Sequence, residues 1–248
     1  MVANRQTLTW LSWTLVILAV ISAAVTLLFV TGVLRPPPPA GSEDFVDRLQ
    51  FMRTQDEKAF PFVIVGSLAT LGVYLIAAML GLVLRAWTLP TSTRDAMTLL
   101  LVFGGLIGIG SQLLNIGAGD AARPFLCDCG YRAEEQVGLA RALDVAWSMI
   151  NWMTIGAVTF VGIGVALAGR VVQVSSTWRL LSYVIAAGVL VAVAIRVVAS
   201  LVFIEAFDPF QVSDLIVAVA LGILVPIWAV LLGRGVSEPG EQPLPAAV

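Results

Sequence analysis

One arginine in this chain occupies an unusually apolar setting. Arg196 is the sole charged residue in the stretch from Leu180 to Phe203. A charge at the centre of a membrane helix costs roughly 2.5 to 3.5 kcal/mol on translocon scales, so it usually faces a protein partner or a water-filled cavity. We expect Asp144 and Glu205 to supply the counter-charge, because a paired buried charge is tolerated where an unpaired one is costly.

A stripe of polar side chains runs along a second apolar stretch. Arg141, Asp144, Ser148 and Asn151 recur at i, i+3, i+7 and i+10, which places them on one face of a helix. Arg141 therefore joins Asp144 and Glu205 among the residues expected to form charge pairs. The stripe contains no histidine, no activated nucleophile and no pair of carboxylates, so it does not favour catalysis.

Depth along the helices predicts that three polar residues share one level. At 1.5 Å per residue, Arg196 lies about 24 Å, Asn115 about 28 Å and Asn151 about 27 Å from the same side of the membrane. One interpretation is structural, with Arg196 snorkelling to the headgroups or pairing with Asp144. The other is an outward-facing polar cavity that binds a small or anionic solute or a lipid headgroup, with these expected lining residues: Arg196, Asn151, Asn115, Gln112, Asp144 and Ser148.

The cysteines and the absence of histidine give little support for catalysis or metal binding. Cys127 and Cys129 are the only cysteines, and a disulfide between residues two apart requires a strained ring. They form at most a thiol pair, with a capped thiol, an intermolecular bridge or a soft-metal contact as alternatives. Histidine is absent, which removes the commonest metal ligand and neutral-pH acid or base. We expect no metal, no cofactor and no enzymatic activity.

The composition requires a membrane-embedded class of fold. The 248 residues are 59% hydrophobic and 12% charged, against about 25% charged in soluble domains. About 20 apolar residues cross a bilayer as a helix, and six such runs are present, at residues 10–34, 61–84, 96–116, 145–169, 180–203 and 215–233. No basic cluster supports nucleic-acid binding. Partners are expected to be membrane lipids and proteins, including further copies of this chain.

Loop charges predict the orientation of these spans. If the six helices alternate, one side of the membrane collects these short-loop arginines: Arg5, Arg85, Arg94, Arg170, Arg179 and Arg234. By the positive-inside rule that side is cytoplasmic. Both termini are then cytoplasmic, in the plasma membrane of a bacterium, with a single domain over residues 1–236 and a disordered tail over 237–248.

Local patterns refine this six-helix bundle. Phe45, Leu49 and Met52 recur at helical spacing between the first two spans, which predicts a short amphipathic helix on the outer surface. Small residues four apart, such as Gly104 and Gly108, predict close helix contacts. Two further expectations concern proline and tryptophan. Pro226 should kink the sixth span, and most of the seven tryptophans should form an interfacial belt.

The chain contains, in order, an anchor helix, a polar outer loop, paired second and third spans, and the glycine-rich segment 162–169 leading to Trp178. This layout resembles a bacterial family of six-span membrane proteins of unknown function. It implies a six-helix bundle and no particular activity. We therefore expect an all-α integral membrane protein that acts as a non-enzymatic accessory or structural subunit of a membrane assembly. The alternative is a binding or transport protein for a small solute, lipid or anion.

Overall fold

The computed structural model describes residues 5–34, 45–126, 133–202 and 209–235. All elements within these residues are helical: α1 (Arg5–Val30), α2 (Phe45–Trp87), α3 (Ser92–Leu126), α4 (Ala133–Val171), α5 (Ser176–Val202), α6 (Pro209–Val219), a π-helical turn η1 (Ala220–Leu224) and α7 (Val225–Gly235). The helices contain six stretches long and apolar enough to cross a membrane: Gln6–Val30, Pro61–Trp87, Ser92–Asp120, Arg141–Val171, Ser176–Leu201 and Val212–Gly235. The expected all-helical fold with six apolar spans is confirmed at this level.

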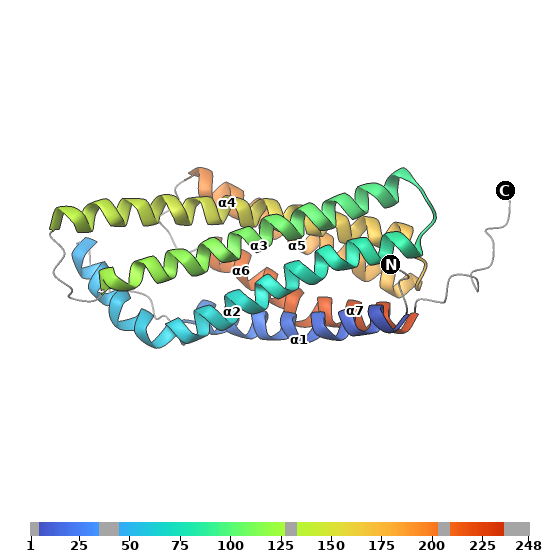
Figure 1. The fold of residues 1–248 in the computed structure, drawn as a ribbon, viewed down its shortest axis with the longest axis horizontal. Helices are drawn as coiled ribbons and strands as arrows, with labels where there is room; N and C mark the ends of the chain where they lie inside the picture. Colours follow the sequence, from blue (N-terminus) through green and yellow to red (C-terminus); the bar gives the residue numbers. More distant parts are fainter. Residues whose placement is uncertain (1–4, 35–44, 127–132, 203–208, 236–248) are drawn as a thin grey trace.

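The helices form one elongated bundle of antiparallel neighbours (Figure 1). Helix α1 begins and α7 ends at the same end of the bundle, called here the terminal end. The short turns between α2 and α3 and between α4 and α5 lie at that end too. Helices α3 and α4 extend past α1 and α5 at the opposite end (Figure 1). The position of a residue along the bundle is described below by whether it lies nearer the terminal end or the opposite end.

The segment expected to form a separate surface helix is instead the first part of α2. This helix runs without interruption from Phe45 to Trp87 and contains Pro61. Proline lacks a backbone N–H and its ring crowds the preceding turn, so a helix that contains it bends without ending. Figure 1 shows the early part of α2 curving away from the bundle's long axis. The prediction of a separate amphipathic helix is wrong, because this segment is continuous with the second apolar stretch.

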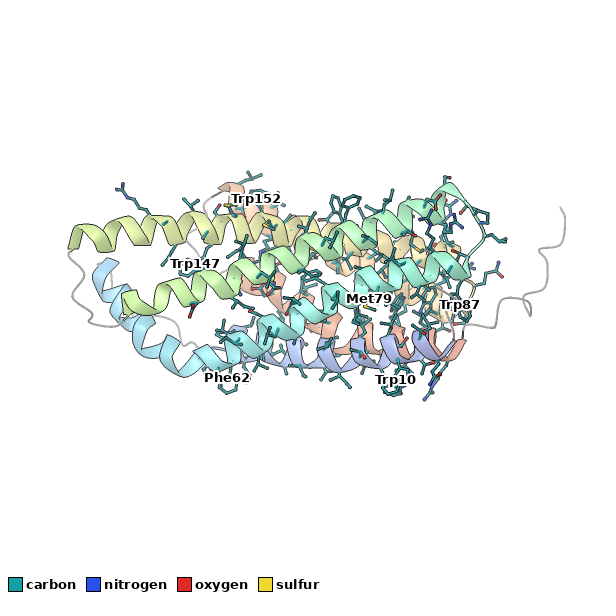
Figure 2. All side chains as sticks on the ribbon, in the orientation of Figure 1. Trp10, Phe62, Met79, Trp87, Trp147 and Trp152 are labelled. Atoms are coloured by element: carbon teal, nitrogen blue, oxygen red, sulfur yellow. The ribbon has the colours of Figure 1, made fainter. Side chains whose placement is uncertain are left out.

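Tight packing is concentrated in the half of the bundle near the terminal end. The fully buried residues there include Leu8, Leu84, Met97 and Leu232, from four different elements. Large apolar side chains cover the outer surface, such as Trp10 and Phe62, which project away from the bundle (Figure 2). An apolar exterior around a packed interior is the pattern expected of helices that contact lipid.

Glycines bring α3 close to both of its neighbours. A Cβ atom on Gly104 would lie 2.9 Å from Phe160 and 3.0 Å from the carbonyl oxygen of Ala157, both on α4. A Cβ atom on Gly108 would overlap the ring of Tyr74 on α2. The helix contacts predicted from the spacing of these two glycines are confirmed, and one of them seats Tyr74.

Candidate functional site

A cavity of about 490 Å³ lies inside the bundle. Side chains from all six apolar stretches line it, and η1 contributes as well. Ligand pockets in proteins typically measure about 300 to 1,000 Å³. The cavity is therefore of a size that holds a small organic molecule.

The two ends of this cavity differ in chemistry. Near the terminal end the lining is apolar, with these residues: Leu15, Leu80, Leu101, Val165, Ile185 and Trp228. Toward the opposite end it becomes polar, with these residues: Gln112, Asn115, Thr154, Arg196, Ser213 and Asp214. Because neighbouring helices run antiparallel, residues early in one span and late in the next meet at one level. The cavity is amphipathic along its length.

Arg196 is held by groups from two neighbouring helices. Its Nε–H donates to Oδ1 of Asn151 on α4 at 2.6 Å, and its Nη1–H donates to Oδ1 of Asp214 on α6 at 2.7 Å. The arginine and aspartate side chains are 23% and 36% exposed. Nδ2 of Asn151 in turn donates to the hydroxyl of Ser200, which donates to the carbonyl oxygen of Arg196. The guanidinium thus faces protein, and its position is fixed by α4 and α6.

Hydrogen bonds between side chains tie the walls of the cavity together. Nδ2 of Asn115 on α3 donates to the hydroxyl of Ser67 on α2 at 3.0 Å. The Ser22 and Thr70 hydroxyls are 2.7 Å apart between α1 and α2, and the Ser111 and Thr154 hydroxyls are 2.7 Å apart between α3 and α4. Pairing buried hydroxyls in this way avoids the cost of leaving them unsatisfied.

Two polar residues that line the cavity, Tyr74 and Gln112, take no part in this hydrogen-bond network. Tyr74 is only 7% exposed and lines the cavity, and its hydroxyl forms no hydrogen bond with any described residue. Arg196 lines the same cavity. Gln112 is partly buried, lines the same cavity and likewise makes no hydrogen bond within the described part of the chain. Neither group is among the described buried polar atoms that lack a partner, which are Ser12 Oγ and Trp87 Nε1, so the Tyr74 hydroxyl and the Gln112 amide are accessible to a ligand from the cavity.

Trp228 lines the apolar end of the cavity and packs on a second tryptophan, Trp178, that does not line it. The rings of Trp178 and Trp228 stack with centroids 5.2 Å apart. Nε1–H of Trp178 donates to the carbonyl oxygen of Trp228, and Nε1–H of Trp228 donates to the hydroxyl of Ser182 at 2.8 Å. Both tryptophans are buried, as is Trp87. The burial of these three does not fit the expected interfacial belt, whereas Trp10 is exposed.

A π-helical turn places α6 and α7 along the cavity wall. The backbone N–H of Val225 donates to the carbonyl oxygen of Ala220, five residues earlier. The next residue is Pro226, which cannot donate and whose ring would crowd the carbonyl of Gly222 in a regular α-helix. The wider turn relieves that crowding, and Ala220 and Leu221 within it line the cavity. Pro226 was expected to kink the span, and the structure has a π turn directly before it.

The residues predicted as a site separate into three groups. The structure brings Arg196 and Asn151 into direct contact, and Asn115 and Gln112 line the same cavity. Ser148 and Arg141 are exposed, and Ser148 is not among the residues that line the cavity. The other predicted residues lie outside the part of the chain, or the side chains, that the structure describes: the side chain of Asp144, Glu205, Cys127, Cys129 and the tail from 237.

The observed acid partner of Arg196 is Asp214, which the sequence analysis did not select. Asp214 directly precedes the apolar run expected at residues 215–233 and therefore falls outside it. The same depth arithmetic from Gly233 places it about 28 Å from the terminal end of its helix, at the level of Asn115 and Asn151. Its depth was thus a usable signal. In the described residues, no three His, Cys, Asp or Glu side chains gather as a metal site would require.

Comparison with known proteins identifies no relative from which a role for this site could be taken. No protein-family model, curated protein or solved structure matches the chain.

Proposed function

We propose that this protein binds a small amphiphile inside the membrane, with the ligand's polar group near Arg196 and its apolar body directed toward Trp228. One observation carries the proposal: the cavity of about 490 Å³ has a polar end and an apolar end and is lined by all six spans. A molecule with one polar group and an apolar body matches both ends at once. Apolar contact area would supply most of the affinity, and the few polar groups would fix its orientation.

The proposal includes a location for this cavity. Six apolar helices support a multi-pass membrane protein, and the arginines of the short loops favour a bacterial plasma membrane with both termini in the cytoplasm. In that orientation the polar end of the cavity lies in the outer half of the bilayer. A ligand with its polar group there has the same orientation as an outer-leaflet lipid.

The competing proposal is that the protein is an accessory or structural subunit, and it predicts different properties. Such a subunit would bind a protein partner in fixed stoichiometry and would have no need of an occupied cavity. Binding without reaction is common to both proposals.

Native mass spectrometry of the purified protein tests the choice between them. Val158 lines the cavity from α4, and Val145 on the same helix is 62% exposed. Val158→Phe should narrow the cavity, whereas Val145→Phe adds the same volume on the lipid-facing surface. We expect the wild type and Val145→Phe to retain one amphiphile per chain, and Val158→Phe to retain less of it.

A second pair of variants shows whether lost occupancy in the first pair comes from misfolding. Ala192 lines the cavity on α5 and is 1% exposed, while Ala187 on the same helix is exposed. Ala192→Leu should reduce occupancy and Ala187→Leu should not. Equal occupancy in all variants would contradict the proposal, because the retained molecule would then sit elsewhere. A stoichiometric protein partner without any bound amphiphile would favour the accessory subunit.

A further inference from the structure

We propose that the ligand's polar group is uncharged, a hydroxyl or a carbonyl, and that Tyr74 and Gln112 recognise it while Arg196 remains in its pair with Asp214. This inference rests on the proposed function and names the chemical class of its ligand.

The charge balance of the cavity is the first argument. Among the described residues that line it, Arg196 and Asp214 alone carry charge, and they neutralise each other at 2.7 Å. A charged ligand would bring a third charge beside a pair that is already neutral, and no other described lining residue carries an opposite charge. A charge removed from water without a partner is disfavoured.

The engagement of the arginine is the second argument. Nε and Nη1 of Arg196 already donate to Asn151 and Asp214, so the guanidinium is held in place before any ligand arrives. An anionic ligand at the same Nη1 position would have to compete with the Asp214 carboxylate. Displacing that carboxylate would leave an acid without its counter-charge, which offsets the new contact.

The polar groups left over are the third argument. The Tyr74 hydroxyl both donates and accepts, and the Gln112 side chain offers an amide N–H and a carbonyl oxygen. Both residues line the cavity and neither forms a hydrogen bond with the residues that the structure describes. A hydroxyl or carbonyl on a ligand could satisfy both without changing the charge balance.

Close packing holds Tyr74 in position for this role. Its ring lies against Gly108, where a Cβ atom would overlap it, and its carbonyl oxygen would lie 2.7 Å from a Cβ atom on Gly105. Helix α3 therefore supports the phenol from behind, and 93% of the residue's surface is covered, since it is 7% exposed. A side chain fixed in this way is preorganised for binding.

Three brominated probes with the same chain distinguish the head groups: 12-bromododecanol, 12-bromododecanoate and 12-bromododecylammonium. Bromine quenches nearby tryptophans, so a probe whose head lies at Tyr74 carries its bromine toward Trp228. The readout is the saturable quenching that is present in the wild type and absent in Trp228→Phe. The protein is the full chain in detergent micelles at neutral pH.

We expect the alcohol to quench Trp228 saturably and the two charged probes to bind at least about tenfold more weakly. Tyr74→Phe and Gln112→Met should each weaken alcohol binding by about two- to tenfold, the usual effect of one hydrogen bond. The matched changes Tyr183→Phe and Gln173→Met lie at exposed positions and should have no effect.

Each contrary outcome has a distinct meaning. Binding of the acid or the amine as tight as that of the alcohol would overturn this inference and leave the cavity a binding site. Unchanged alcohol affinity in both Tyr74→Phe and Gln112→Met would also overturn it. If none of the three probes quenches Trp228, both this inference and the proposed function fail.

Discussion

Separating Arg196 from Asp214 should destabilise the bundle more than breaking a surface ion pair of the same charge type. The two side chains meet at 2.7 Å and are 23% and 36% exposed. Removing one partner of a fully buried pair costs about 3 to 5 kcal/mol. Because about a third of the aspartate is accessible, we scale this to a coupling of about 2 kcal/mol between the two residues.

The chain contains its own control for that measurement. Arg85 and Asp95 form a pair at 3.4 Å whose side chains are 53% and 48% exposed. An exposed pair of this kind contributes about 0 to 1 kcal/mol. Both pairs involve an arginine and an aspartate on adjacent elements. Asp95 also pairs with Arg94 at 3.0 Å, an interaction that a cycle on Arg85 and Asp95 does not count.

The assay is a double-mutant cycle on the free energy of unfolding, measured by titration of SDS into mixed micelles. The variants are Arg196→Gln, Asp214→Asn and the double change, with Arg85→Gln, Asp95→Asn and their combination alongside. The coupling free energy of the inner pair should exceed that of the surface pair by at least about 1 kcal/mol. Equal couplings would refute the reasoning, since burial would then contribute nothing to the pair.

Two further substitutions test the packing around the cavity. Trp228→Phe removes one indole hydrogen bond and part of a ring stack, so it should lower the free energy of unfolding by about 2 kcal/mol, whereas Trp10→Phe at a position 68% exposed should change it by less than about 0.5 kcal/mol. Gly108→Ala should lower the free energy of unfolding by about 1 to 3 kcal/mol because its methyl group would displace the Tyr74 ring, while Gly117→Ala, with no atom near the new Cβ, should be neutral or slightly stabilising. Thermal unfolding in detergent measures the effect of all four substitutions. Equal effects within either pair would contradict the packing described.

The helices themselves could be predicted because each apolar run is long enough to cross a bilayer on its own. The runs expected from hydropathy begin and end within a few residues of the observed stretches. The regions between them were harder to predict. Helices α3 and α4 continue through Asp120 and Arg141, because charge ends an apolar run without ending a helix.

The site was predictable only in part. Counting depth along two helices brought Arg196 and Asn151 to one level, and the structure places them in contact. Asp214 was missed because it lies at the boundary of its run. Tyr74 was missed for a different reason: its role depends on packing against Gly108, which no spacing within one helix reveals. Burial of Trp228 likewise depends on which face of its helix meets α5.

The most direct test of the central claim is an electron cryomicroscopy map of the protein purified from membranes into nanodiscs. The account predicts elongated density inside the bundle, beginning beside Tyr74 and Arg196 and extending to Trp228, with Arg196 in contact with Asp214. A bundle whose interior is filled by its own side chains, or in which Arg196 points toward the surrounding lipid, would contradict it.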